Sequence, residues 1–385
     1  MNFFSSQFKL GILGGGQLGK MLLFETRKFD IQTYVLDPNI DAPCKFACNK
    51  FFHGSLTDFE AVYNFGKQVD ILTFEIELVN LEALEKLESE GLKIFPSPKT
   101  LKLIQNKGVQ KEFYVKNGIP TSEFLKFPDL QNLKSKINLQ NSAVKFPFVW
   151  KCTKFGYDGN GVKIVKSKED LDNLPDVECI IEEIIAFKNE LAVIVVRNEA
   201  GEVRNYPVVE MEFHPEANQV EYVICPARID EKVAQKAIAI ALKVSEIFNH
   251  VGLLAVEMFQ TQDDEILVNE VAPRPHNSGH QTIEASYTSQ FENHLRAILN
   301  LPLGNCDSKL AGIMVNLVGE EGFSGNVIYE NIEKIMAISG VTPHIYGKQQ
   351  TRPFRKMGHV TIINQDIAKA RKIAEEVKNC IRVVC

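Results

Sequence analysis

The sequence lacks several features that mark membrane, secreted or metal-finger proteins. No stretch approaches the apolar length of a membrane span, and the first residues have no basic start followed by a long apolar segment. The eight cysteines are scattered and form no Cys-x-x-Cys pair, which favours free thiols in a reducing compartment. We therefore expect a cytoplasmic location and no membrane partner.

Basic residues are also too few for a general nucleic-acid binder. The formal net charge is −6 at pH 7, although local basic pockets for phosphate remain compatible with that balance. With 385 residues and 45% hydrophobic content, the chain can bury a large core but is too long for one ordinary domain. Two or three domains are expected.

A glycine-rich turn follows the first apolar segment. Residues 8–13 predict a buried strand, and the run from Gly14 to Gly19 then opens a helix. The spacing Gly14-x-Gly16-x-x-Gly19 permits a tight turn and lets an anion approach backbone N–H groups at the helix start. Further strands are predicted at 33–36 and 69–74, with a helix at 58–67 between them. This alternation predicts a parallel α/β sheet.

The glycine turn has more than one interpretation. A nicotinamide dinucleotide would place its ribose hydroxyls on Asp37, but glycine turns also serve other phosphates or only helix packing. The third predicted strand ends at Glu75 and Glu77, at the sheet edge where open α/β domains bind ligands. Alternatively, this is an ordinary strand-to-helix connection, since Asn80 precedes an amphipathic helix at 81–87. We favour Glu75 for ligand contact.

Prolines at 96 and 98 indicate the end of a first domain, after which a helix is predicted at 99–116. Lys107 and Lys111 lie four residues apart and share a face of that helix, where a solvated basic face is the simpler explanation. An apolar strand at 146–152 carries Lys151 where burial should be deepest. A buried lysine needs an anion.

A glycine hairpin separates that strand from another predicted at 162–165. It lacks the Gly-Lys-Ser/Thr ending of a P-loop, but a flexible hairpin could close over nucleotide phosphates paired with Lys151. A plain hairpin turn leaves the lysine unexplained. Strands are next predicted at 178–185 and 191–196, and an adenine could lie in the apolar seam between them.

Two acids and a polar loop form the most chemically dense part of the chain. Glu257 interrupts a strand predicted at 251–259, and Glu270 follows a short strand at 266–268. If the two strands form a hairpin, both carboxylates face one cavity and suggest a divalent cation, most naturally Mg²⁺ held partly by substrate phosphates. The alternative is two separately solvated acids. The following loop crowds together Arg274, His276, Asn277, Ser278 and His280.

The C-terminal part contains a basic loop. Strands are predicted at 310–318 and 341–345, and residues 347–356 then contain four cations in an otherwise acidic protein. A phosphomonoester would suit them, and a solvated loop is the alternative. A helix at 366–378 closes the chain.

In this order, the segments resemble the ATP-grasp superfamily, and within it the N5-carboxyaminoimidazole ribonucleotide synthetases. The motifs that carry the resemblance are residues 14–21, 73–75, 155–161, 269–280 and 356–359. The resemblance covers nearly the whole chain. It implies α/β and α+β structure: an N-terminal parallel α/β pre-ATP-grasp domain over 1–104, a small lid domain over 105–186 and a large ATP-grasp domain over 187–385.

The resemblance also implies an activity. The chain would be an ATP-dependent carbon–nitrogen ligase that carboxylates 5-aminoimidazole ribonucleotide with bicarbonate, through carboxyphosphate, in purine biosynthesis. Its cofactors would be ATP and Mg²⁺, its other partners the two remaining substrates, and its assembly a homodimer. No nucleic-acid partner is expected.

Site residues carry over by position. Those implied for ATP are Lys107, Lys151, Gly156, Tyr157, Asp158, Gly159, Asn160, Gly161, Glu182, Glu183, Ile184, Ile185, Glu190, Asn269 and Glu270. Those implied for the ribonucleotide are Gly16, Gln17, Glu75, Tyr157, Asp158, Lys348 and Arg355. Glu257 and Glu270 would hold the metal. Arg274, His276 and Asn277 would face bicarbonate, and either His276 or Asp158 would take the amine proton. Asn160 departs from the family pattern, because many relatives carry Lys or Arg there.

Three other functions fit parts of the pattern. A sister ATP-grasp ligase, such as the glycinamide ribonucleotide transformylase type, would share the ATP residues but not the 271–280 run. A nicotinamide oxidoreductase would use the glycine turn. A catalytically silent nucleotide-binding subunit is disfavoured, because Lys151 and both proposed metal acids are present.

Overall fold

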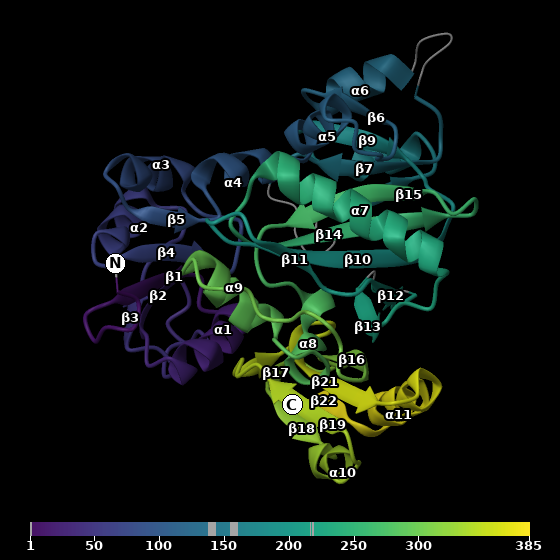
Figure 1. Ribbon diagram of the computed structural model, residues 1–385. Coiled ribbons are helices and arrows are strands. Elements are labelled where there is room, and N and C mark those ends of the chain that lie inside the picture. Colours follow the sequence, from purple (N-terminus) through teal and green to yellow (C-terminus); the bar gives the residue numbers. More distant parts are fainter. Residues whose placement is uncertain (1, 138–143, 155–160, 216, 218) are drawn as a thin grey trace.

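Three main sheets follow one another along the chain of the computed structural model, and Figure 1 shows the first at the left, the second at the top and the third extending from the centre to the bottom. The structure describes residues 2–137, 144–154, 161–215, 217 and 219–385. Among these residues, no helix combines the length and the apolar character needed to cross a membrane.

The first sheet has five parallel strands in the order β3-β2-β1-β4-β5. They are β1 (Lys9–Leu13), β2 (Gln32–Asp37), β3 (Lys50–His53), β4 (Ile71–Phe74) and β5 (Lys93–Phe95). The strand order reverses between β1 and β4, so the loops after these two strands open the crevice in which sheets of this kind bind ligands.

Helices cover both faces of this sheet. One face packs against α1 (Gln17–Lys28) and α9 (Gln290–Ile298), and the other against α2 (Phe59–Gly66) and α3 (Leu81–Ser89). Asp58 and Asn80 cap α2 and α3 by accepting hydrogen bonds from the backbone N–H groups of Ala61 and Ala83, both at 2.8 Å. The predicted helix starts are therefore confirmed.

Two predictions in the first 116 residues are wrong. The predicted third strand is the fourth, because β3 forms at the sheet edge, where a short, partly exposed strand has little hydrophobic pattern. The helix predicted at 99–116 is two helices, α4 (Pro98–Ile104) and α5 (Lys107–Lys116). Asn106 adopts an extended backbone between them, and its side chain accepts from Val109 N at 3.0 Å. This cap competes with continuation of the helix.

The second sheet is antiparallel, in the order β6-β9-β7-β8. Its strands are β6 (Phe124–Phe127), β7 (Phe148–Cys152), β8 (Val162–Val165) and β9 (Cys179–Glu183), with α6 (Leu130–Ile137) and a 3-10 turn at Glu169–Asn173 beside them. Trp150 and Phe148 fill the small core between sheet and helix. The strand predicted at 178–185 ends at Glu183, and Ile184 is exposed.

The third sheet has nine strands in the order β15-β14-β10-β12-β13-β16-β21-β19, with β11 paired to β10. Its strands are β10 (Phe187–Arg197), β11 (Val203–Asn205), β12 (Val209–Phe213), β13 (Val220–Cys225), β14 (Gly252–Thr261), β15 (Ile266–Ala272), β16 (Ala311–Val318), β19 (Val341–Ile345) and β21 (Lys356–Asn364). β15 extends beyond its predicted end at Val268, so Asn269 and Glu270 lie within the strand and not in a turn.

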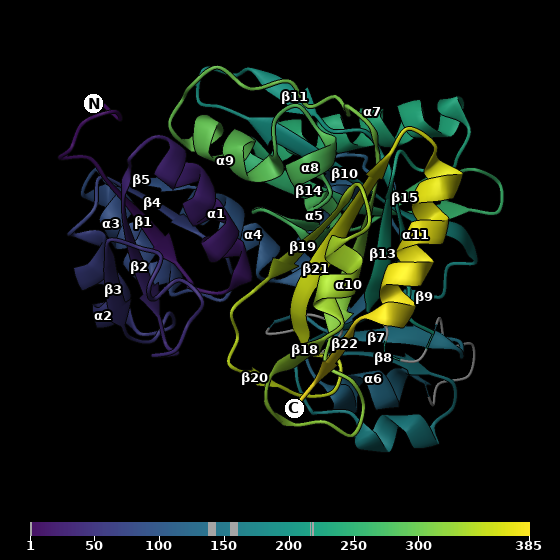
Figure 2. The ribbon, with the colours of Figure 1, turned by 90° about the horizontal axis from the view of Figure 1, so that it is seen from below.

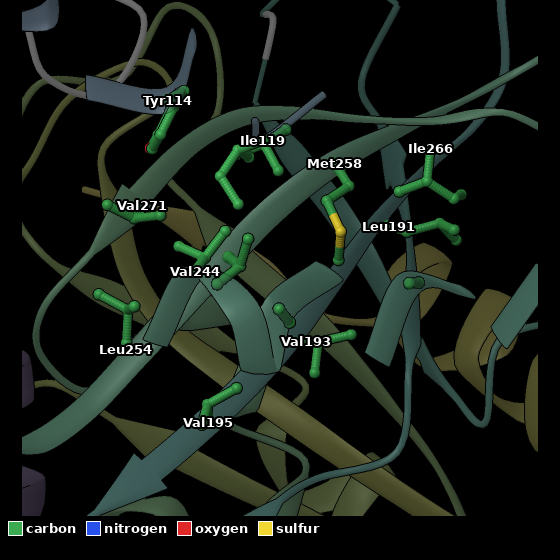
Figure 3. Packing of buried hydrophobic residues seen from close by; sticks show 14 of the residues in the cluster. Tyr114, Ile119, Leu191, Val193, Val195, Val244, Leu254, Met258, Ile266 and Val271 are labelled. Atoms are coloured by element: carbon green, nitrogen blue, oxygen red, sulfur yellow. The ribbon is translucent and has the colours of Figure 1, made fainter. Parts of the chain in front are cut away.

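Helix α7 (Glu231–Phe248) covers β10 and β14 and buries the largest apolar cluster. Leu191, Val193, Met258 and Ile266 from the strands and Val244 from the helix belong to this cluster (Figure 3). Tyr114 and Ile119 close the same cluster from α5 and the segment after it, so α5 is anchored in the core of the third sheet.

The C-terminal strands carry their own helices. α10 (Ile332–Met336) and α11 (Ile367–Cys380) pack on β16, β19 and β21, as Figure 2 shows from below. The 3-10 turn Asn277–Gly279 and α8 (Thr282–Ala285) lie between β15 and α9. Two small pairs, β17 (Gly325–Asn326) with β20 (Gln350–Thr351) and β18 (Ile328–Glu330) with β22 (Arg382–Val384), complete the fold.

Candidate active site

The glycine turn is occupied by the chain's own carboxylates. Glu75 accepts hydrogen bonds from the backbone N–H groups of Gly16 and Gly19, the latter at 2.7 Å, and Asp37 accepts from Gly15 N at 2.7 Å. Burial raises the pKa of Glu75, and the two backbone hydrogen bonds oppose that rise. A dinucleotide pyrophosphate would need these same N–H groups. The nicotinamide interpretation is therefore disfavoured.

A cleft of about 370 Å³ opens beside this turn. It is lined by Gly16, Asp37, Asn39, Asp41, Ala42, Pro43, Lys348, Gln349, Gln350 and Arg355. Three residues expected at the ribonucleotide site, Gly16, Lys348 and Arg355, thus share one cleft, although they come from opposite ends of the chain. Gln17 is the half-buried first residue of α1 next to it.

Both cations and carboxylates line the cleft. Lys348 Nζ donates to the carbonyl oxygen of Lys356 at 2.7 Å and Arg355 donates to that of Gln350 at 2.6 Å, which holds two cations on one wall. Asp37 and Asp41 also line the cleft. The cations suit a phosphate group, and the carboxylates suit sugar hydroxyls or an amine.

The two proposed metal acids lie directly opposite each other. Glu257 of β14 pairs in register with Glu270 of β15, so the predicted hairpin is confirmed. Glu270 forms an ion pair with Lys107, and Glu257 Oε1 lies 3.1 Å from His276 Nε2. Burial, together with the charges of Glu270 and Glu190, raises the pKa of Glu257, whereas Lys107 lowers the pKa of Glu270.

This pair of carboxylates fits a magnesium ion whose coordination is completed by oxygen atoms of a bound ligand and by water. In the described part of the chain, no group of three or more His, Cys, Asp or Glu side chains gathers to enclose a metal alone. Mg²⁺ in nucleotide enzymes is commonly held by one or two carboxylates plus phosphate oxygens and water. Burial, and then the charges of Glu270 and Glu190, raise the pKa of Glu257, and a bound cation would favour the ionised form of this carboxyl.

Lysines surround the same end of the sheet. Lys151 Nζ lies 3.0 Å from Glu182 Oε1 and donates to Asn269 Oδ1 at 3.1 Å. Lys111 lies on the other side of Glu182, and only 3% of its side chain is exposed. The solvated basic face considered for Lys107 and Lys111 is therefore wrong. Both lysines point inward at carboxylates.

The remaining nucleotide candidates differ in exposure. Burial raises the pKa of Glu190 to about 7, an effect that Lys151 opposes and Glu270 reinforces. Glu183 and Ile184 are exposed, and Ile185 is half-buried. Gly161 accepts a backbone hydrogen bond from Cys152 N at 2.9 Å. Gly156, Tyr157, Asp158, Gly159 and Asn160 lie outside the described residues.

The loop after β15 is fixed by neighbours far away in sequence. Arg274 Nε lies 2.8 Å from Glu77 Oε1, two residues beyond the carboxylate that fills the glycine turn. Asn277 and Asn316 exchange amide hydrogen bonds at 3.0 and 2.9 Å. The buried Gln290 accepts from His276 N at 2.9 Å and donates to His276 O at 2.7 Å. His276 is therefore held by its backbone while its ring faces Glu257.

Sequence reasoning missed several contributors to this site. Asn39 and Asp41 line the cleft, and the polar run after β2 was the signal that could have identified them. Gln290 and Asn316 position the loop, but they belong to an amphipathic helix and an apolar strand and carry no local signal.

Comparisons with known proteins agree with this arrangement. Residues 8–105 match the ribonucleotide synthetase preATP-grasp domain, 112–291 the ATP-grasp domain and 312–373 the phosphoribosylaminoimidazole carboxylase C-terminal domain. The N5-carboxyaminoimidazole ribonucleotide synthase of Bacillus subtilis is 37% identical over 92% of this chain and 91% of its own. The chain is 38% identical to the phosphoribosylaminoimidazole carboxylase of Ogataea methanolica but spans about two thirds of its length, 68%.

Solved structures give the same result. The crystal structure of N5-carboxyaminoimidazole ribonucleotide synthetase from Thermotoga maritima has 44% identity and a TM-score of 0.89, covering 98% of this chain and 99% of its own. The Aspergillus clavatus enzyme, in complex with ADP and 5-aminoimidazole ribonucleotide, has 35% identity and a TM-score of 0.87 over 97% and 98% of the two chains. The chain therefore belongs to the N5-carboxyaminoimidazole ribonucleotide synthetase family of ATP-grasp ligases.

Proposed function

We propose that this protein uses ATP and bicarbonate to carboxylate the exocyclic amine of 5-aminoimidazole ribonucleotide in purine biosynthesis. The observation that carries this proposal is a continuous set of contacts between two charged sites. Glu270 lies among Lys107, Lys151 and Glu257, and the loop that follows reaches Glu77 through Arg274. The segment that contains Glu77 also supplies Glu75, which fills the glycine turn at the cleft.

In this proposal, the two sites take different substrates. Lys107, Lys151, Asn269 and Glu190 would bind ATP, with Glu190 on the ribose and the lysines on the phosphates. The cleft would take the ribonucleotide, its phosphate on Lys348 and Arg355. Because the Glu182 carboxylate is held by Lys151 and Lys111, Glu182 would contact the adenine through its backbone.

The proposed reaction has two bond-forming steps. An oxygen of bicarbonate attacks the γ-phosphorus of ATP, ADP leaves, and carboxyphosphate forms. The amine nitrogen of the ribonucleotide then attacks its carbonyl carbon, phosphate leaves, and a proton is lost to His276 or Asp158. Lys151 and Arg274 would stabilise the charge on the transferred group. The glycine hairpin that follows Lys151 would exclude water when it closes over the phosphates.

The metal contribution is limited to charge. Glu257 and Glu270 would hold Mg²⁺, which would neutralise charge on the phosphoryl oxygens during transfer. His276 contacts Glu257, and its other ring nitrogen lies 2.9 Å from Ser278 Oγ. These two contacts fix the ring orientation of His276.

We also propose three less direct features. The three sheets support a division of the chain at about residues 104 and 186. The family resemblance supports a homodimer, which sedimentation velocity would test. A cytoplasmic location is compatible with the described helices and would be checked by cell fractionation.

ADP release tests the proposed activity. The complete mixture of ATP, Mg²⁺, bicarbonate and 5-aminoimidazole ribonucleotide should release ADP rapidly, and omission of the ribonucleotide should lower the rate strongly. ADP release that does not depend on the ribonucleotide would contradict the assignment. Labelled bicarbonate distinguishes a sister ligase acting on another acid, because only the proposed reaction places the label in the product.

A further inference from the structure

Lys111 is a buried lysine that the proposed chemistry does not use. Its Nζ lies 3.1 Å from Glu182 Oε2 and donates to Thr121 Oγ1 at 2.6 Å and to Ser122 Oγ at 2.8 Å. An ammonium group has three hydrogens to donate, and these three oxygens satisfy them. Lys111 is therefore a fully bonded cation and not a spare surface charge.

Glu182 divides its carboxylate between two lysines. Its Oε1 lies 3.0 Å from Lys151 Nζ, and its Oε2 accepts from Ser122 Oγ at 2.7 Å besides facing Lys111. Only 4% of the Glu182 side chain is exposed, so water cannot take over either partner. A buried carboxylate with one cation removed would direct its whole charge at the other.

This cluster lies at the joint between the second and third sheets. Thr121 Oγ1 donates to the carbonyl oxygen of Val268 at 2.7 Å, and Val268 N donates to that of Pro120 at 2.8 Å. The chain at 120–122 is thus hydrogen-bonded to β15 just before it enters β6. Lys111 therefore connects the segment at 120–122, through Thr121 and Ser122, to Glu182 of β9.

We propose that Lys111 is a positioning residue for the binding of ATP phosphates. By neutralising one oxygen of Glu182, it limits the hold of Glu182 on Lys151 and keeps the Lys151 ammonium directed toward Asn269 and the phosphates. Without Lys111, Glu182 competes with the phosphates for Lys151. The inference rests on the proposed function in one respect, the contact between Lys151 and the phosphates.

Binding of ATP and of adenosine separates this role from a merely structural one. In titration calorimetry with Mg²⁺, Lys111→Met should weaken ATP binding by about tenfold to a hundredfold, the cost of one hydrogen bond to a charged group. Adenosine binding should change by less than about twofold, because adenosine has no phosphate for Lys151 to contact. An equal loss for both ligands, or no loss for ATP, would overturn the proposal.

Lys126→Met is the matched control. Lys126 joins the same helix to β6 through Glu112 at 3.0 Å, but this ion pair is partly exposed. Lys126→Met should change neither the ATP affinity nor the adenosine affinity by more than about twofold, since exposed ion pairs contribute little.

A second background keeps the test decisive if Lys111→Met does not fold. Because Lys111 acts through Glu182, adding Lys111→Met to Glu182→Gln should leave ATP affinity within about twofold of that of Glu182→Gln alone. A further loss in the double variant would overturn the proposal. These binding measurements need no turnover. The role of Lys111 in ATP binding can therefore be decided even if the carboxylation assay fails.

Discussion

Ionisation of Glu190 should make the protein less stable as pH rises, and replacement of Glu190 should remove that loss of stability. Burial raises the pKa of this carboxyl from 4.5 to about 7, so the folded protein holds the proton more tightly than the unfolded chain does. The contribution of protonated Glu190 to the free energy of unfolding is fully present below pH 4.5 and is lost as pH rises through 7. At pH 8, the ionised side chain costs on the order of 3 kcal/mol, reduced to roughly 2 kcal/mol by its partial exposure.

Glu190→Gln removes the titrating proton at nearly constant volume. In metal-free protein, its thermal midpoint should exceed that of the wild type by roughly 4–8 °C at pH 8 and match it near pH 5. Its affinity for ADP should fall by about tenfold, because the charged acceptor proposed for the ribose is lost. The variant is therefore expected to be more stable and less functional. Thermal unfolding and calorimetry measure the two effects.

Glu210 supplies a matched control of opposite sign. It lies on β12, opposite Leu191 in the sheet. Although burial opposes it, hydrogen bonds from Arg228 lower the pKa of Glu210. Its contribution to stability is present at neutral pH and lost in acid, so Glu210→Gln should lower the midpoint at pH 8. A Glu190→Gln variant that keeps the pH profile of the wild type would refute the reasoning.

Three further changes probe other parts of the site. Gly14→Ala should lower stability by about 1–3 kcal/mol in thermal unfolding, because Gly14 has φ +95° and a Cβ would stand 2.5 Å from Cγ of Glu75. Glu270→Gln should reduce turnover by more than about a hundredfold, and full activity would contradict the metal assignment. Lys348→Met should raise the KM for the ribonucleotide by about tenfold to a hundredfold while leaving that for ATP unchanged, and the reverse pattern would remove Lys348 from the cleft's proposed role.

Local signals in the sequence were sufficient for much of the fold. Strands β8 and β19 occur with their predicted bounds, α3 begins after the predicted capping residue Asn80, and α2 begins one residue after its predicted start. The break before α5 was missed because the helical pattern continues across it, and only the capping by Asn106 distinguishes the two helices. Strand β3 was missed because an edge strand of this length has no buried face to create a pattern.

The site was less predictable because its partners come from distant parts of the chain. The spacing of Lys107 and Lys111 predicted that they share a face of α5, but it did not show that this face points inward, because nothing nearby in sequence indicates Glu182 as the partner of Lys111. Likewise, the glycine turn suggested an external anion, whereas Glu75 fills it because β1 and β4 are neighbours in the sheet. Sequence patterns proposed candidate residues, and the strand order showed which groups those residues contact.

The fate of bicarbonate oxygen tests the central mechanistic claim most directly. If bicarbonate attacks ATP and the amine then takes the carboxyl group of the resulting carboxyphosphate while phosphate leaves, one oxygen of ¹⁸O-labelled bicarbonate must leave with the phosphate. Mass spectrometry of the inorganic phosphate should therefore find ¹⁸O in proportion to the carboxylated ribonucleotide formed. Unlabelled phosphate in the presence of labelled product would contradict the proposed phosphorylation of bicarbonate.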